Sequence, residues 1–384
     1  MATVGTLTST PIPDPMAHPD DYKGVKALGT LNASEKVSFD PSTHLSHTPP
    51  SRVYSMEELG YPESRGVSPI GVSEPFPLFS AEAIQQMRKE VLSDEVFAKW
   101  KYSSELAQCQ LRGYAADCAP FIYDAWKNPE TLAIISKIAG VDLVPAIDFE
   151  IGHVNLAVYS EEEKNKGLNE MMERASRAAD EGVSDCPWED CDPIVDWHTD
   201  SYPFVCVTML SDCTGMIGGE TALRRGNGEI VKVRGPQMGY AVILQGRYIE
   251  HQALRALGGT ERISMVTSFR PRASLIKDDT VLTTVRPISD LGELYLQFSE
   301  YRFDMLQDRF RHANKLMRDQ QRARRPFDTL RLKQFIREQI DFLEHMDKEI
   351  VEDDKVVAGI VDDSHLISEE LKLERSKKRR IAVA

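Results

Sequence analysis

The sequence predicts a mostly β core of the sandwich or jelly-roll type, flanked by α-helices at both ends. Many short segments between about 143 and 270 are rich in Val, Ile, Thr, Phe and Tyr and are separated by Gly or Pro, which is typical of antiparallel β proteins. Helical periodicity precedes this region and returns after about 290. The predicted strands are 143–151, 153–159, 203–210, 219–224, 229–233, 238–244 and 262–270.

Helix-capping patterns define the elements before the β region. Ser55 and Glu58 form a capping box that predicts a short helix. Ser80 is placed to cap a second helix with apolar residues on one face. A third helix is predicted to begin after Asn128, with Pro at its first position, and to stop at Gly140.

Two features interrupt the predicted strands. Arg225-Gly-Asn-Gly-Glu229 predicts a β-hairpin, because Asn-Gly tolerates the positive φ of a type I′ turn. Residues 160–192 form an acidic, partly helical insertion between two predicted strands. Loops of this length are often lids or binding loops, so we expect the insertion to close over a substrate.

The chain divides into three predicted parts. Residues 1–75 form a flexible or draped arm, because the first fifty are rich in Pro, Ser, Thr and Asp. Residues 76–290 form the jelly-roll domain, and 291–384 form a helical extension. We expect the extension to pack outside the sheet, and a homodimer through its helices is an open expectation. Its two apolar stripes are Leu294, Phe298, Tyr301, Met305 and Leu306, and Leu332, Phe335, Ile336, Ile340 and Leu343.

Composition narrows the class of protein. The 384 residues carry a formal net charge of −14, which argues against a nucleic-acid partner. No apolar run approaches the roughly 20 residues that span a bilayer, and the N-terminus lacks the features of a secretory signal. The six cysteines form no CxxC pair, and free thiols fit a reducing compartment. We therefore expect a cytoplasmic protein that does not bind membranes.

One segment predicts a metal site. Asp196-Trp-His-Thr-Asp200 places His198 and Asp200 two residues apart, so that on a strand both side chains point to the same face. His251 follows 51 residues after Asp200, in a region that can fold back beside this pair. Two imidazoles and one carboxylate on one side of an ion leave the opposite positions open, which is the facial triad of non-heme Fe(II) oxygenases. We expect these three ligands to be the catalytic residues, with none beyond them.

A second pattern predicts a carboxylate-binding site. Arg262 and Ser264 lie two residues apart at the start of a predicted strand, so they share a face. Together they can bind a carboxylate, the guanidinium through two parallel hydrogen bonds. Binding the distal carboxylate of 2-oxoglutarate requires such a pair.

These motifs resemble the plant- and fungal-type 2-oxoglutarate/Fe(II) dioxygenases, of the isopenicillin N synthase-like type. The likeness runs from about Glu74 to Arg272 and includes HTD, GGET, MGYAVILQGR before EHQAL, and the RIS triplet. The resemblance implies a double-stranded β-helix (jelly roll), Fe(II), 2-oxoglutarate and O2. It also implies that an Asn or Tyr before HxD contacts 2-oxoglutarate, and Asn155 and Tyr159 occupy that region. The insertion is longer than the usual link before HxD.

Some residues have alternative interpretations. His153 competes with His251 as a ligand, because it also lies in a predicted strand. We expect His251, since the Arg-x-Ser triplet follows it at the spacing of the family. Arg262 and Ser264 would otherwise form an exposed polar edge of the sheet.

The substrate is less defined by the sequence. Arg270 shares the face of the carboxylate-binding pair and Arg247 precedes the third ligand, so both favour a small carboxylate-bearing substrate. The acidic insertion would then meet an ammonium group. By resemblance alone, an amino acid such as valine is a concrete prediction. If both arginines are solvated, a bulky specialised metabolite fits between Tyr202, Phe204 and Leu210.

The predicted activity is abstraction of hydrogen from an unactivated C–H bond of a small molecule. Hydroxylation, desaturation and ring closure all remain open. One rival is a 2-oxoglutarate-independent iron oxidase, in which Arg262 and Ser264 hold the carboxylate of the substrate itself. The other is a non-catalytic jelly-roll binding protein.

Overall fold

The computed structural model describes two main ranges of the chain. These are residues 37–160 except 105, 106 and 108, and residues 193–361 except 215, 234–236, 255, 258 and 260. A few positions in 162–169 and in 365–372 are also described. The predicted lid, 160–192, therefore lies almost entirely outside the described residues, as does the first part of the predicted arm.

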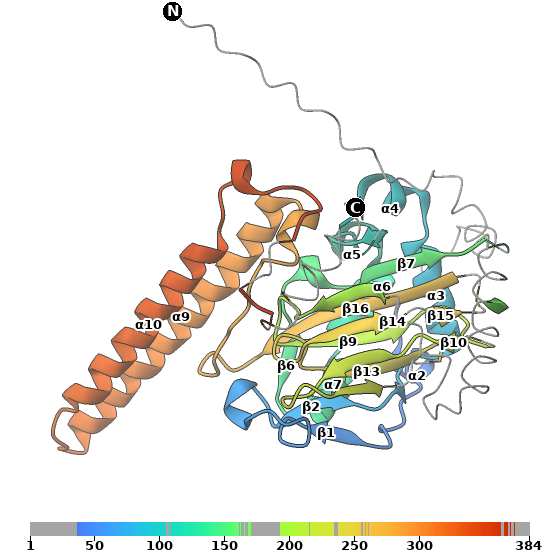
Figure 1. Cartoon of the computed structure of the whole chain (residues 1–384). Coiled ribbons are helices and arrows are strands. Elements are labelled where there is room, and N and C mark those ends of the chain that lie inside the picture. The colour runs from blue at the N-terminus through green and yellow to red at the C-terminus, as the bar shows by residue number, and fades with distance from the viewer. Residues whose placement is uncertain are drawn as a thin grey trace, which may run out of the picture.

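Ten strands form one antiparallel sheet, which carries half of the site (Figure 1). Its central strands are β9 (Phe204–Met209), β16 (Glu261–Pro271) and β7 (His153–Val158). Residues 53–73, assigned from sequence to the arm, supply β1 and β2 at one edge. The other strands are β1 (Val53–Ser55), β2 (Ile70–Ser73), β3 (Phe76–Pro77), β4 (Lys101–Tyr102), β5 (Gln110–Leu111), β6 (Leu143–Pro145) and β13 (Tyr240–Leu244).

A four-stranded antiparallel sheet carries the other half of the site. Its order is β12 (Ile230–Val233), β11 (Thr221–Arg224), β14 (His251–Leu254) and β8 (Pro193–His198). A further pair joins β10 (Ile217–Gly218) to β15 (Ala256–Leu257). Side chains of β9 and β16 line one cavity together with side chains of β8 and β14, so the two larger sheets face each other. The chain is thus mostly antiparallel β with helices, as predicted.

Helices cover the other face of the large sheet. Alternate residues of β16, including Ile263, Met265 and Phe269, are fully buried in a core shared with these helices. Ser80 and Asn128 cap α3 and α7 through their side chains, and Gly140 ends α7 with a φ of 71°, which confirms the predicted boundaries. The helices are α2 (Pro41–His44), α3 (Ala81–Val91), α4 (Asp94–Lys99), α5 (Ala115–Cys118), α6 (Pro120–Lys127) and α7 (Pro129–Ala139), and the 3-10 turns are η2 (Glu63–Arg65), η3 (Asp148–Glu150), η4 (Arg286–Ile288) and η5 (Asp353–Lys355).

One local prediction from turn chemistry is wrong, and a second is confirmed as a hairpin but not in its turn type. Ser55 and Glu58 make both reciprocal capping-box bonds, at 3.0 and 2.8 Å, yet the chain turns instead of continuing as a helix. The predicted hairpin joins β11 to β12, but Asn227 does not have a positive φ. Only Gly228, at 87°, does, so the turn is not type I′.

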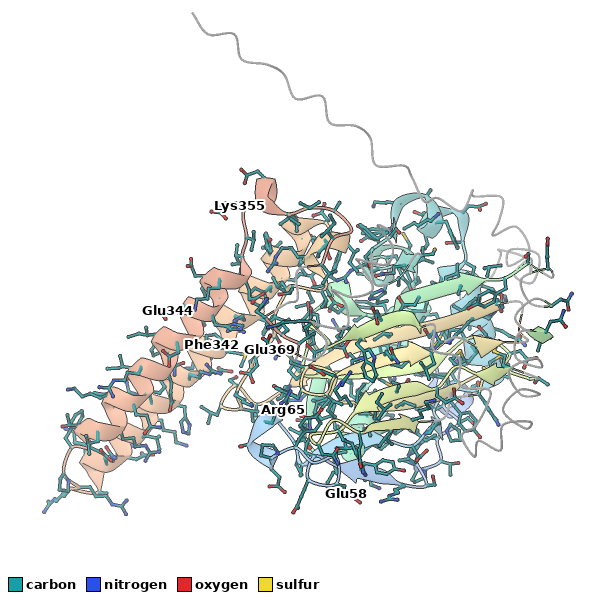
Figure 2. All side chains as sticks on the ribbon, viewed as in Figure 1. Glu58, Arg65, Phe342, Glu344, Lys355 and Glu369 are labelled. Carbon is teal, nitrogen blue, oxygen red and sulfur yellow. The ribbon has the colours of Figure 1, made fainter. Side chains whose placement is uncertain are left out.

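The C-terminal extension is an antiparallel pair of long helices, α9 (Leu291–Arg322) and α10 (Thr329–Glu349), that projects away from the sheets (Figure 1). The predicted stripe of α9 is buried against the core, which confirms it. The predicted stripe of α10 is wrong, since Ile336, Ile340 and Leu343 are exposed. The buried side of α10 instead presents Phe342, whose ring stacks under two arginines of α9. In Figure 2, Phe342 lies on the inner side of α10 and Glu344 on its outer edge.

None of the helices in the described ranges is long and apolar enough to cross a membrane.

Candidate iron and 2-oxoglutarate site

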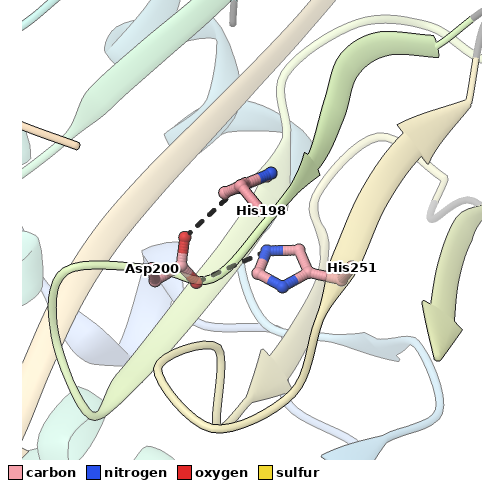
Figure 3. Close-up of side chains that lie close together, drawn as sticks. All are labelled: His198, Asp200 and His251. Atoms are coloured by element: carbon pink, nitrogen blue, oxygen red, sulfur yellow. Dashed lines mark ion pairs between the residues drawn. The ribbon is translucent and has the colours of Figure 1, made fainter. Parts of the chain in front are cut away.

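The structure brings His198, Asp200 and His251 together at the edge of the small sheet (Figure 3). His198 ends β8 and His251 begins β14, and the two residues are direct partners in the antiparallel pairing. Nε2 of His198 lies 3.5 Å from Oδ1 of Asp200, and Nε2 of His251 lies 3.5 Å from Oδ2. One potential ligand atom from each residue lies within 4.8 Å of the others, so a single ion can contact all three.

Hydrogen bonds orient both imidazoles for metal binding. Nδ1 of His198 lies 2.7 Å from the carbonyl oxygen of Asp196, and Nδ1 of His251 lies 2.9 Å from that of Ile249. A carbonyl oxygen only accepts, so Nδ1 carries the proton and donates it in the neutral ring. The lone pair of Nε2 then points toward the carboxylate. Metal-ligating histidines usually make such a bond with their second nitrogen.

The charges at this point call for a cation. Burial lowers the pKa of His251, which keeps its imidazole neutral. Burial would raise the pKa of Asp200, but His251 and His198 outweigh burial when their rings are protonated and keep that pKa below its ordinary value, so the group is a carboxylate. Oδ2 of Asp200 is buried without a hydrogen-bond partner among the described residues. A half-buried carboxylate whose buried oxygen faces an imidazole lone pair is costly unless a metal ion is bound, and this donor set suits Fe(II).

Gly246 makes room for the carboxylate, a role that the sequence reasoning missed. Its carbonyl accepts a hydrogen bond of 2.9 Å from the backbone N–H of Asp200. A Cβ at this position would lie 1.7 Å from Oδ2 of Asp200, which no side chain tolerates. Gly246 lies in the motif MGYAVILQGR, between a predicted strand and the third ligand. A glycine at such a position indicates a close approach of another group to the backbone.

Arg262 and Ser264 lie on the cavity face of β16, as predicted from their spacing. Nη1 of Arg262 lies 3.4 Å from Oγ of Ser264, and only 5% of Arg262 is exposed. Burial lowers the pKa of Arg262, while nearby Tyr159 and Cys213 act in the opposite direction. Among the described residues, its Nε has no hydrogen-bond partner and no carboxylate forms an ion pair with it. The guanidinium stays charged, so this end of the cavity is suited to an anion.

The two residues expected from the resemblance both lie near this cation. Asn155 faces Ser264 directly across the pairing of β7 with β16, and it lines the cavity. Tyr159 follows β7 and lies near Arg262, but it is not among the residues that line the cavity. Asn155 is therefore the better placed of the two.

The metal-ligand group and Arg262 line the same cavity, of about 140 Å³. Opposite the arginine, the cavity is lined by Glu150, His153 and Tyr202, and by the 284–288 segment. Nε2 of His153 and Oη of Tyr202 are buried without hydrogen-bond partners in the described structure. His153, the rival ligand, lies outside the group of three whose atoms converge.

Four residues predicted to contact substrate do not line this cavity. Arg270 donates from Nε to the carbonyl of Ala146, and its guanidinium stacks on Tyr301. Arg247 donates to the carbonyl of Asp279. Phe204 and Leu210 point into the helix-covered core, because the alternate residues of β9 face the cavity. Of the five residues predicted to contact substrate, only Tyr202 lines the cavity and could contact a substrate bound there.

His153 is expected to make the protein sensitive to acid. It is surrounded by protein, and burial, assisted by Arg112, lowers its pKa to about 3. The unfolded chain takes up a proton below about 6.5, whereas the folded protein does so only near 3, so stability falls as pH falls through this window. The cost at pH 5 is about 2 kcal/mol.

His153→Gln should remove this part of the pH dependence. The free energy of unfolding in urea, measured at pH 7 and pH 5, should fall less in the variant than in the wild type. His312→Gln, on the exposed surface of α9, is the control and should leave the difference unchanged. An equal fall in His153→Gln would contradict the assignment.

No family model and no curated protein matches this chain. Several solved structures are similar to part of the chain. A Pseudomonas putida prolyl-4-hydroxylase is 14% identical over 50% of this chain and 88% of its own, with a TM-score of 0.31. A 2OG-Fe(II) oxygenase family oxidoreductase from Burkholderia pseudomallei is 11% identical over 46% of this chain and 76% of its own, with a TM-score of 0.31. The α-ketoglutarate-dependent epimerase SnoN is 14% identical over 57% of this chain and 83% of its own, with a TM-score of 0.34. Likeness this distant says nothing about the activity of the chain.

Proposed function

We propose that this protein is a non-heme Fe(II), 2-oxoglutarate-dependent oxygenase that acts on a C–H bond of a small molecule. One observation carries the proposal. A two-histidine, one-carboxylate group and a buried arginine with no carboxylate partner among the described residues line the same small cavity. Neither the metal ligands nor the cation is explained by packing alone. The isopenicillin N synthase-like subtype remains a prediction.

The residues divide the work of this activity. His198, Asp200 and His251 would hold Fe(II), which when bound supplies the oxidation that is coupled to conversion of 2-oxoglutarate and O2 into succinate and CO2. Arg262 and Ser264 would bind the distal carboxylate of 2-oxoglutarate and fix its orientation. The valine side chains of β8 and β9 that line the cavity exclude water and strengthen these polar contacts.

The structure changes the preferred substrate class. Arg262 is the one Lys or Arg among the described residues that line the cavity. If 2-oxoglutarate binds Arg262, no second Lys or Arg among the described lining residues is available for the carboxylate of a substrate. His153 and Tyr202 offer uncharged hydrogen-bonding groups instead. We therefore favour a neutral, hydroxyl- or carbonyl-bearing metabolite over an amino acid such as valine.

Arg262→Gln is expected to weaken 2-oxoglutarate binding by about 100-fold, because the carboxylate loses a charged, paired donor. Affinity for Fe(II) should change little, since Arg262 is not a ligand. Titration of the anaerobic Fe(II) protein with 2-oxoglutarate measures both. Arg270→Gln, in the same strand but outside the cavity, is the matched control and should bind 2-oxoglutarate as the wild type does.

Succinate release separates the proposal from its rivals. Amino acids and a mixed metabolite extract are screened for stimulation of succinate formation by the Fe(II) protein. Product without succinate would identify an oxidase that holds the carboxylate of its substrate at Arg262. If the protein bound neither Fe(II) nor 2-oxoglutarate, the result would favour the non-catalytic jelly-roll binding protein. Stimulation by an amino acid alone would contradict the neutral-substrate preference.

A further inference from the structure

The hairpin of α9 and α10 exposes an apolar face. Phe303 and Phe310, with Leu296, recur every seven residues along α9, on the side opposite the residues buried against the core. Ile336, Ile340 and Leu343 lie together on α10, and the ring of Phe310 contacts Phe335 next to them. The six exposed side chains are between 43 and 62% exposed, so this outer face is defined as Leu296, Phe303, Phe310, Ile336, Ile340 and Leu343.

The outer face is large enough for a stable interface. α10 has 21 residues. Such a helix is about 31 Å long, and two helices side by side are about 20 Å wide. The face therefore covers roughly 600 Å², of the order of the about 800 Å² that each partner buries in a standard interface. Contiguous apolar surface of this kind on a monomer marks an interaction site.

Charge along the hairpin is strongly polarised. Lys and Arg outnumber Asp and Glu by ten to four in the distal part, 307–339. Acidic residues outnumber basic ones by seven to two in the proximal parts, 291–306 and 340–349. Each hairpin thus has a basic tip and an acidic base. Two copies placed antiparallel bring each tip against the base of the other, whereas two parallel copies oppose like charges.

We propose that two copies of this chain pair antiparallel through their outer faces and form a four-helix bundle around a twofold axis near Ile340. Such an axis places α10 against α10 and α9 against α9. Ile340 then contacts its equivalent, and Phe303 of one copy packs against Phe310 of the second. The twofold makes both halves of the interface identical.

Charged side chains flank the apolar contact in matching positions. Residues three, four and seven positions from Ile340 lie on its side of the helix. Lys333 lies seven residues before Ile340 and Asp347 seven after, so each Lys333 faces Asp347 of the second copy. Arg337 likewise approaches Glu344. Within the described residues, these four side chains form no ion pair, and all of them are exposed.

The mass of the full-length protein in solution tests this proposal. Light scattering after gel filtration should give about twice 43.3 kDa at micromolar concentration. Ile340→Asp, which places two charges at the axis, should raise the dissociation constant by about 100-fold. Leu330→Asp is the matched control, because Leu330 is 82% exposed on the same helix but outside the outer face. Circular dichroism confirms that each variant is folded.

Charge reversal tests the orientation independently. Lys333→Glu and Asp347→Lys should each weaken the dimer by about tenfold, and the double variant should restore it. A parallel dimer would show no restoration, because Lys333 would face its own equivalent. A monomeric wild type, a dimer that Ile340→Asp leaves unchanged, or a double variant no tighter than the single ones would each overturn the proposal.

Discussion

Replacing His251 with alanine is expected to lower the affinity for Fe(II) by more than 100-fold and to abolish turnover. The loss should exceed the about 10- to 100-fold that follows removal of an outer hydrogen-bond partner of a ligand. Nε2 of His251 is one of three converging donors, and its lone pair is aimed by the bond from Nδ1 to Ile249. Metal content after anaerobic loading, together with succinate release, measures the effect.

His153→Ala is the matched control, because His153 lies in the same cavity outside the ligand group. It should retain Fe(II). If His153→Ala lost the metal while His251→Ala kept it, the third ligand would be wrongly assigned.

Gly246→Ala is expected to disrupt the site almost as strongly, although Gly246 contacts no metal. The added methyl group would lie 1.7 Å from Oδ2 of Asp200, and the carboxylate must leave its position. The variant should therefore lose Fe(II) binding by a factor comparable with Asp200→Ala. Its apo form should still fold, since the Asp200 side chain is only half-buried and its carboxylate can rotate.

Gly292→Ala, near the start of α9, controls for the general effect of replacing glycine with alanine. A Cβ at this position would lie 3.4 Å from Oδ1 of Asp290, which is an ordinary contact. This control should bind Fe(II) as the wild type does. Wild-type affinity in Gly246→Ala would show that the observed placement of Asp200 is not the one that binds metal.

Local patterns in the sequence predicted the strand that carries Arg262 and Ser264, but the predicted strands did not include β8 and β14, which carry His198 and His251. The spacing of His198 with Asp200, and of Arg262 with Ser264, predicts a shared face because side chains alternate along a strand. The structure places Arg262 and Ser264 so, within β16. Asp200 lies after β8, which ends at His198, yet its carboxylate still converges with His198. That the two pairs meet in one cavity depends on two sheets facing each other, which the motifs implied only through the family resemblance.

Long-range packing decided what the sequence could not. Arg270 lies an even number of residues from Arg262 and Ser264, so its position predicts the same face of β16. It lies at the far end of that strand, however, where its guanidinium stacks on Tyr301 of α9. The apolar residues of α10 form a stripe in the sequence. In the structure, however, Phe342 is buried because it stacks against two arginines of α9, and Ile340 stays exposed. Gly246 is required only because Asp200 packs against it across the fold.

Anaerobic titration with Fe(II), followed by 2-oxoglutarate, tests the central claim most directly. We expect one Fe(II) per chain and a weak visible charge-transfer band when 2-oxoglutarate is added. Asp200→Ala should lose the bound Fe(II), whereas Arg262→Gln should keep it and require far more 2-oxoglutarate for the band. A fully iron-loaded wild type that gives no band, or an Asp200→Ala variant that binds Fe(II) as tightly as the wild type, would contradict it.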